Sequence, residues 1–197
     1  MIHLHDIELS FEKKKVFNDF SLHVKRGEHV CLAGGSGKGK TSVLKMVQGY
    51  VQPNKGHVEI NGEVLNVNTV NAIRSMLTIV PQNVNLPVQS GLELIQLLEL
   101  EDKQQKIPDY LEQLNLTADF LKKSFNEISG GEKQRIVVSI CLSQEKPVLL
   151  MDEPTASLDE KSIERLYKTI SSLKELTVLS TSHNENWQKA ADRIIHL

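Results

Sequence analysis

The stretch Gly34-Gly35-Ser36-Gly37-Lys38-Gly39-Lys40-Thr41 decides the fold of this chain, because it joins a predicted strand to a predicted helix. The strand is the short apolar segment 28–33, and the helix is segment 41–48, whose apolar residues recur at helical spacing. The loop matches the pattern G-x-x-x-x-G-K-[ST], in which backbone N–H groups and a helix start surround phosphate oxygens. We therefore predict a cradle for a nucleoside triphosphate.

The residue types in this loop each have a chemical reason. Glycine accepts positive φ angles and lets a phosphate approach without a Cβ in the way. We expect Lys40 to reach the β- and γ-phosphates, and the Thr41 hydroxyl to ligate Mg²⁺. Lys38 is a second cation in the loop. It could contact phosphate or point to solvent, and the small contribution of surface charges favours solvent.

Two acids follow a second apolar stretch. Asp152 and Glu153 come directly after segment 148–151, whose unbroken apolar run is typical of a strand buried on both faces. Ligands of open α/β sheets bind at the carboxyl ends of the strands. We therefore expect Asp152 to hold Mg²⁺ and Glu153 to polarise an attacking water. Taken alone, two acids in this place could also cap the next helix.

The composition excludes several classes of protein. The chain has 197 residues, of which 40% are hydrophobic and 24% charged, a balance typical of one globular domain. Lysine and arginine number 23 against 25 acids, so we expect no nucleic-acid partner. No apolar stretch approaches the ~20 residues that span a bilayer, and no signal peptide is recognisable. Isolated Cys31 and Cys141 fit packing roles in a reducing compartment, so we expect a cytoplasmic protein.

The order of the predicted elements indicates an α/β fold. We expect strands in the first sixty residues, with a hairpin turn at Asn61-Gly62, and we interpret Lys13 to Lys15 as a solvated hairpin tip. Helical spacing covers segment 90–121 and recurs after residues 135 and 162, whereas further strands are expected near 177–182 and 194–197. Such alternation implies a mainly parallel sheet with right-handed crossovers.

Several short motifs occur in an order that resembles the nucleotide-binding subunits of ABC (ATP-binding cassette) ATPases. The resemblance covers nearly the whole chain, and six matches in order are far more specific than one. The matching segments beside the phosphate loop are Phe11 (adenine-stacking aromatic), Val80-Pro81-Gln82 (Q-loop), Ile128-Ser129-Gly130-Gly131-Glu132 (signature), Asp152-Glu153-Pro154-Thr155 (Walker B), Ser157-Leu158-Asp159 (D-loop) and His183 (switch histidine).

This resemblance implies a P-loop NTPase (RecA-like) core with a mainly parallel sheet, an N-terminal antiparallel β subdomain and an inserted helical subdomain at about 83–147, all in one domain of residues 1–197. The implied ligands are ATP and Mg²⁺. Mg²⁺ would be organised by Thr41, Gln82 and Asp152, and catalysis would use Glu153, His183 and Lys40. The residues implied at the nucleotide are Phe11, Gly34, Gly35, Ser36, Gly37, Lys38, Gly39, Lys40, Thr41, Ser42, Gln82, Ser129, Gly130, Gly131 and Asp159.

Some of these assignments have simpler alternatives. Ser129 followed by Glu132 also predicts an ordinary helix cap, and both roles are compatible because a capped helix end is still an anion site. Phe11 alternates with Ile7 and Leu9, so it could instead be a packed strand residue. His183 after a strand could be structural, and Gln82 could be a polar loop residue.

In the family, the signature of one subunit faces the γ-phosphate held by another, so the resemblance implies a partner copy of this chain. It also implies separate transmembrane permease subunits that hold the protein at the cytoplasmic face of a membrane. The bare core resembles the ATPases of compact bacterial transporters, with metal-ion exporters as one candidate. The alternative is a soluble ABC-type ATPase that acts on DNA or ribosomes, although this chain lacks the insertions, zinc module or tandem cassettes usual there.

Overall fold

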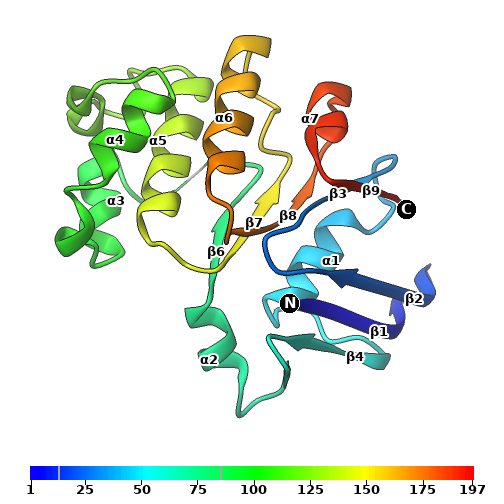
Figure 1. Cartoon of the computed structure of the whole chain (residues 1–197). Coiled ribbons are helices and arrows are strands. Elements are labelled where there is room, and N and C mark those ends of the chain that lie inside the picture. Colours follow the sequence, from blue (N-terminus) through cyan, green and yellow to red (C-terminus); the bar gives the residue numbers. More distant parts are fainter. Residues whose placement is uncertain (13, 85) are drawn as a thin grey trace.

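The computed structural model of this protein describes residues 1–12, 14–84 and 86–197, and arranges them in two β-sheets and a set of short helices (Figure 1). The strands are β1 (Ile2–Phe11), β2 (Lys14–Val24), β3 (His29–Ala33), β4 (Lys55–Ile60), β5 (Glu63–Val64), β6 (Leu77–Val80), β7 (Val148–Asp152), β8 (Thr177–Thr181) and β9 (Arg193–His196). The helices are α1 (Lys40–Val47), α2 (Val70–Ser75), α3 (Gly91–Leu97), α4 (Ile107–Gln113), α5 (Gly130–Ser143), α6 (Glu160–Ser172) and α7 (Glu185–Ala190), with 3₁₀ turns η1 (Glu101–Lys103) and η2 (Ala118–Lys122).

The central sheet is parallel throughout, as the alternation of strands and helices predicts. Its order is β6-β7-β8-β3-β9, and each neighbouring pair runs in the same direction. Because parallel strands end at the same edge, the loop after β3 and the acids at the end of β7 are brought to one edge of the sheet. The strand order also places β8 between β7 and β3, so residues after β8 lie between these two groups.

Two hydrophobic cores lie on the two faces of this sheet. Along β7, Leu149 and Met151 belong to the core under helices α3 to α7, whereas Val148 and Leu150 belong to the core under α1 and the N-terminal strands. All five residues of β7 are buried, so the prediction of a strand covered on both faces is confirmed. Figure 1 shows the two coverings on opposite sides of the sheet.

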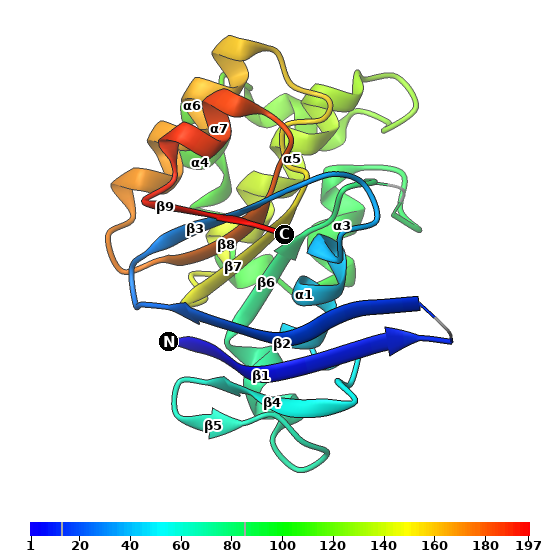
Figure 2. The ribbon, with the colours of Figure 1, turned by 90° about the vertical axis from the view of Figure 1, so that its right-hand side faces the viewer.

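The N-terminal strands form an antiparallel sheet in the order β2-β1-β4-β5, and Figure 2 shows these strands side by side. The predicted turn joins β4 to β5, where Asn61 and Gly62 have φ angles of 54° and 86°. Alternation in β1 buries Ile2 and Leu4 against the core and leaves the intervening side chains on the outer face. Asp6, with a φ of 47°, marks a register shift in β1.

The helical character predicted for segment 90–121 is confirmed. The structure divides the segment into the short helices α3 and α4 and two 3₁₀ turns. Glu99 and Asn115 adopt left-handed φ angles of 53° and 59° just after α3 and α4, and an L residue in this conformation cannot continue a helix. These elements and α5 gather on one side of the sheet (Figure 1), but the subdomain bounds of 83–147 stay a prediction.

Three elements have no counterpart in the predictions: α2, β6 and α7. The short helices α2 and α7 bury one residue each, Ile73 and Trp187, so no apolar period marks them, and a short apolar run such as β6 cannot be assigned by periodicity alone. Within the part of the chain that the structure describes, no helix is both long and apolar enough to cross a membrane.

Candidate active site

The glycine-rich loop connects β3 to α1 and is held in a conformation that suits glycine. Gly34, Gly37 and Gly39 have φ angles of 142°, 76° and 95°. A Cβ on Gly39 would lie 2.5 Å from Phe17 Cζ and 2.7 Å from Val16 Cγ1, so this position has no room for a side chain. Gly39 is also the N-cap of α1 and supplies no side-chain cap. The first N–H groups of α1 therefore lack a side-chain acceptor from the cap residue and are available for an anion.

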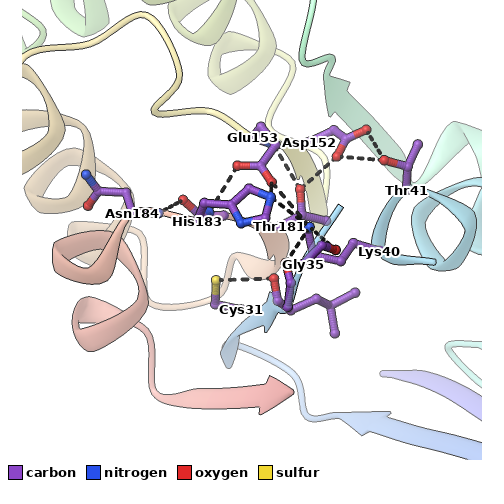
Figure 3. Close-up of polar contacts among 12 residues, drawn as sticks. Cys31, Gly35, Lys40, Thr41, Asp152, Glu153, Thr181, His183 and Asn184 are labelled. Carbon is purple, nitrogen blue, oxygen red and sulfur yellow. Dashed lines mark hydrogen bonds and ion pairs between the residues drawn. The ribbon is translucent and has the colours of Figure 1, made fainter. Parts of the chain in front are cut away.

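Lys40 is the first residue of α1, and its side chain, which is 7% exposed, reaches back to the start of the loop. Its Nζ donates to the carbonyl oxygens of Gly34 at 2.8 Å and Gly35 at 3.3 Å. The same atom lies 3.0 Å from His183 Nε2 and 3.7 Å from Glu153 Oε1 (Figure 3). Residues 143 positions apart in the sequence thus meet at one ammonium group.

The two acids at the end of β7 have different partners. Both oxygens of Asp152 accept from the Thr41 hydroxyl, at 2.9 and 3.2 Å, and Oδ1 also accepts from the Thr181 hydroxyl at 2.7 Å. Asp152 is 8% exposed, and these bonds fix its carboxylate beside the start of α1 (Figure 3). Thr181 was not among the predicted residues. It lies at the end of β8 in register with Asp152, and this pairing becomes apparent only when the order of the strands is known.

Glu153 is held by the loop after β8. Its backbone N–H donates to the Thr181 hydroxyl at 2.9 Å, and its Oε2 accepts from the backbone N–H of His183 at 3.1 Å. Its Oε1 lies 3.2 Å from His183 Nε2, and its φ of 48° turns the chain toward the cavity. Neither Asp152 nor Glu153 caps a helix, because Asp159 caps α6, so the capping alternative is wrong.

A cavity of about 300 Å³ collects most of the predicted nucleotide residues. Lys40, Thr41, Glu153 and His183 line it together with loop residues 36–39. The other predicted residues that line it are Phe11, Ser42 and Gln82. Phe11 is 47% exposed, so the alternative of a packed strand residue is wrong, and its ring is free to contact a ligand.

Two lining residues were not predicted, Lys14 and Val16. Lys14 was assigned with its neighbours to a solvated hairpin tip, but its Nζ lies 3.7 Å from the Cβ position of Gly37 and lines the cavity. The charge run was a signal for this role, because Lys14 begins β2, the strand whose Val16 and Phe17 pack on Gly39 of the loop. Lys13, the first of the run, lies outside the described residues.

The signature residues lie at the start of α5, apart from this cavity. Ser129 Oγ accepts from the backbone N–H of Glu132 at 3.2 Å, and a Glu132 carboxylate oxygen accepts from the backbone N–H of Ser129 at 2.8 Å, which confirms the predicted capping box. Hydrogen bonds from the backbone N–H and the hydroxyl of Ser129 hold the pKa of the Glu132 carboxyl below its usual range. Ser129, Gly130 and Gly131 are not among the described residues that line the cavity, and neither is Asp159.

Ser157 of the D-loop packs against the signature residues Gly130 and Gly131. A Cβ on Gly131 would lie 2.6 Å from the Ser157 carbonyl oxygen, so this contact requires glycine. Asp159 accepts from the backbone N–H of Ser162 at 2.7 Å and so fixes the start of α6. Cys31 and Cys141 are buried, in agreement with their predicted packing roles, and burial raises the pKa of each thiol to about 11.

Comparisons with known proteins point to one family. The family model described as ABC transporter matches residues 17–156. The chain is 30% identical over 208 residues to the energy-coupling factor transporter ATP-binding protein EcfA1 of Leuconostoc mesenteroides, covering 98% of this chain and 76% of that protein. It is 32% identical over 193 residues to the carnitine transport ATP-binding protein OpuCA of Listeria monocytogenes, covering 92% of this chain and 49% of that protein, about half its length.

A solved structure gives the same result. The dimeric structure of MJ0796, described as a bacterial ABC transporter cassette, superposes with a TM-score of 0.87 at 26% identity, covering all of this chain and 94% of that one. The predicted P-loop NTPase fold is therefore confirmed. None of the relatives named here is described as a metal-ion exporter, so that narrower expectation is not supported.

Proposed function

Because the chain belongs to the ABC transporter family and is an ATP-binding subunit with ATPase activity, we propose that its ATP-driven closure powers a separate membrane permease. The observation that carries the proposal is the convergence of Lys40, Glu153 and His183 on one cavity. Lys40 Nζ, which lies 3.0 Å from His183 Nε2 and 3.7 Å from Glu153 Oε1, provides the positive charge that transferred phosphoryl groups require.

Each residue of this network has a distinct role in the proposal. The loop N–H groups and Lys40 bind the phosphates, and Phe11 offers its exposed ring to the adenine base. Glu153, fixed through its contacts with the loop after β8, accepts a proton from the attacking water. His183, which is half exposed at the mouth of the cavity, donates to the γ-phosphoryl group as its charge develops.

The site also suits Mg²⁺. The Thr41 hydroxyl and the Asp152 carboxylate already lie 2.9 Å apart, and Gln82 adds an amide oxygen at the cavity wall. Hard cations such as Mg²⁺ prefer oxygen ligands of this kind, so these three residues would hold the ion. When bound, Mg²⁺ would neutralise phosphate charge and orient the triphosphate.

We further propose that the working unit contains two copies of this chain. The start of α5 presents Ser129 and the first N–H groups of a helix to solvent, and it lies outside the cavity that contains Lys40 and Glu153. Such a surface completes a cavity that already contains Lys40 and Glu153 when it comes from a neighbouring copy. The solved relative MJ0796 is described as dimeric, which supports this arrangement.

The permease would be made of other chains, and it would hold this subunit at the cytoplasmic face of the membrane. The two relatives named above are transporter ATP-binding proteins, which favours this role over the alternative of a soluble ATPase acting on DNA or ribosomes. Co-purification from native membranes tests it. A partner with several apolar helices supports the proposal, whereas ribosomes or DNA in its place would support the alternative.

Mixing two inactive variants tests the shared site. Ser129→Arg destroys the signature surface but leaves the phosphate loop intact, and Lys40→Ala does the reverse. Each variant alone should lose turnover. In a mixture, the intact phosphate loop of a Ser129→Arg copy can face the intact signature of a Lys40→Ala copy. One complete site then forms, and ATPase activity returns.

The matched control carries both changes in one chain. Mixed with Ser129→Arg, the double variant contributes no intact signature, so activity should stay absent. Circular dichroism must show that every variant is folded. Activity that does not return in the first mixture, with all variants folded and able to associate, would contradict the shared site.

A further inference from the structure

The outer face of the antiparallel sheet carries a cluster of histidines that the ATP-binding function does not use. In β1, Ile2 and Leu4 are buried in the core, so His3 and His5 lie on the opposite face. In β4, Val58 and Ile60 are buried, which places His57 and Glu59 on that same outer face. Four potential metal ligands therefore share one face of β1 and β4, two strands that lie side by side (Figure 2).

The strand register brings three of these side chains together. His5 is paired with His57 across β1 and β4, and Glu59 follows His57 by two residues on the same face. The rings of His5 and His57 are stacked, with centroids 4.5 Å apart and an interplanar angle of 16°. One ligand atom from each of His5, His57 and Glu59 lies within 4.8 Å of the other two.

The second observation concerns His5 itself. Its Nε2 is buried and has no hydrogen-bond partner among the described residues. A buried polar atom without a partner is costly, and such atoms in folded proteins call for an explanation. A bound cation would supply the missing partner, because a neutral imidazole nitrogen that carries no proton is a ligand for metal ions.

We propose that His5, His57 and Glu59 bind a divalent transition-metal ion of the Zn²⁺ class on the outer face of the antiparallel sheet. Two imidazoles and one carboxylate are the donor set that Zn²⁺, Ni²⁺ and Cu²⁺ accept, whereas Mg²⁺ prefers oxygen ligands alone. Zinc takes nitrogen ligands at about 2.0–2.1 Å and completes its four positions with water where the protein supplies three. The side chain of His57 is exposed, so it can rotate out of the stacked arrangement and turn a ring nitrogen toward the ion.

The site is separate from the nucleotide cavity. None of His5, His57 and Glu59 is among the residues that line that cavity. Their ligand atoms come from two strands, so a bound ion ties β1 to β4 and stabilises the sheet. Because β1 ends at Phe11, the ion and the nucleotide contact the same strand at different places.

Zinc titration of the full chain, without an affinity tag or nucleotide, tests the site. Competition with a chromogenic chelator should detect saturable Zn²⁺ binding, and Zn²⁺ should raise the Tm. His57→Gln and Glu59→Gln should each lower the Zn²⁺ affinity at least about tenfold, since even changes around a ligand cost 10- to 100-fold. Both are at the surface or partly exposed, so the fold should survive.

Two control variants make the result specific. His23→Gln removes an exposed histidine on the same face that is stacked on His3 but lies outside the ligand set, and it should keep the wild-type affinity. Asp152→Asn should also keep it, because Asp152 lies at the end of β7, where it is bonded to Thr41, and is not one of the proposed zinc ligands. The proposal is overturned by an absence of saturable binding, by an equal loss in His23→Gln, or by a loss in Asp152→Asn that His57→Gln does not share.

Discussion

Helices α1 and α5 both begin at glycine-rich sequences, but their starts are built differently. α1 follows Gly39, which has a φ of 95° and supplies no side-chain cap. α5 follows Ser129, which exchanges hydrogen bonds with Glu132 in a capping box. The start of α1 leaves its N–H groups for a ligand, whereas at the start of α5 the capping box already accepts from some of the backbone N–H groups.

Their surroundings differ in the same sense. The start of α1 lies in a cavity with Lys40, Glu153 and His183, so it has a cation, an acid and a donor at hand. The start of α5 is exposed and rests on the backbone of Ser157. The start of α1 therefore has the groups for binding and chemistry, whereas the start of α5 contributes hydrogen-bond donors to a nucleotide that is held elsewhere.

The largest expected effect separates chemistry from binding at α1. Glu153→Gln should lower ATP turnover about 10²–10⁴-fold, because a general base is lost, while ATP binding is retained. Steady-state ATPase assays and nucleotide titration measure the two quantities. Glu175→Gln is the control, since its carboxylate is 83% exposed and forms an ion pair with exposed Arg26. An ATPase rate unchanged in Glu153→Gln would remove Glu153 from its role.

A smaller effect distinguishes the cap of α5 from its proposed function. Ser129→Ala should cost about 1 kcal/mol of stability through the lost cap. It should also lower turnover roughly 10- to 100-fold, through a lost hydrogen bond to charged phosphate. Ser90→Ala is the matched control, because Ser90 caps α3 with the same 3.2 Å bond to a backbone N–H. Equal turnover in the two variants would show that Ser129 caps α5 and has no role in ATP hydrolysis.

The loop before α1 should be sensitive to a single methyl group. Gly39→Ala combines a positive φ with a close approach to Phe17, so it should cost about 1–3 kcal/mol of stability and weaken ATP binding. Gly62→Ala isolates the backbone part of this cost, since Gly62 has a φ of 86° and nothing within 4 Å of its Cβ position. Urea unfolding and ATP titration compare them, and equal losses of stability would show that packing at Gly39 is unimportant.

The smallest effect is a pH dependence confined to α5. The pKa of Glu132 is lowered by bonds from Ser129, so its contribution is full above its unfolded pKa and is lost as the pH falls through its folded pKa. The difference in unfolding free energy between the wild type and Glu132→Gln should be about 0.3–1 kcal/mol near neutral pH and shrink in acid. Urea unfolding across this range checks it, and a difference that grows in acid would contradict the assignment.

The motifs in the sequence predicted much of the fold and of the candidate site. Gly34 to Thr41, Asp152 with Glu153, and Ser129 with Glu132 are local patterns, in which neighbours in the chain form one turn or one helix start. The elements α2 and α7 were missed because each buries one residue and so shows no apolar period, and β6 was missed because periodicity alone cannot assign a short apolar run. Phe11 was assigned to the adenine base only through the family resemblance, since strand alternation does not tell whether the last side chain of a strand meets a core or a cavity.

The sequence by itself therefore determined the phosphate loop, the alternation of strands and helices, and the family. Only the tertiary structure decided that Lys40 meets His183, that Thr181 holds Asp152, that Lys14 lines the cavity, and that the histidines of β1 and β4 share one face. The physical reason is that periodicity and turn chemistry act between neighbours in the chain. Strand order and register, which bring distant residues together, are set by how the two cores pack on the sheet.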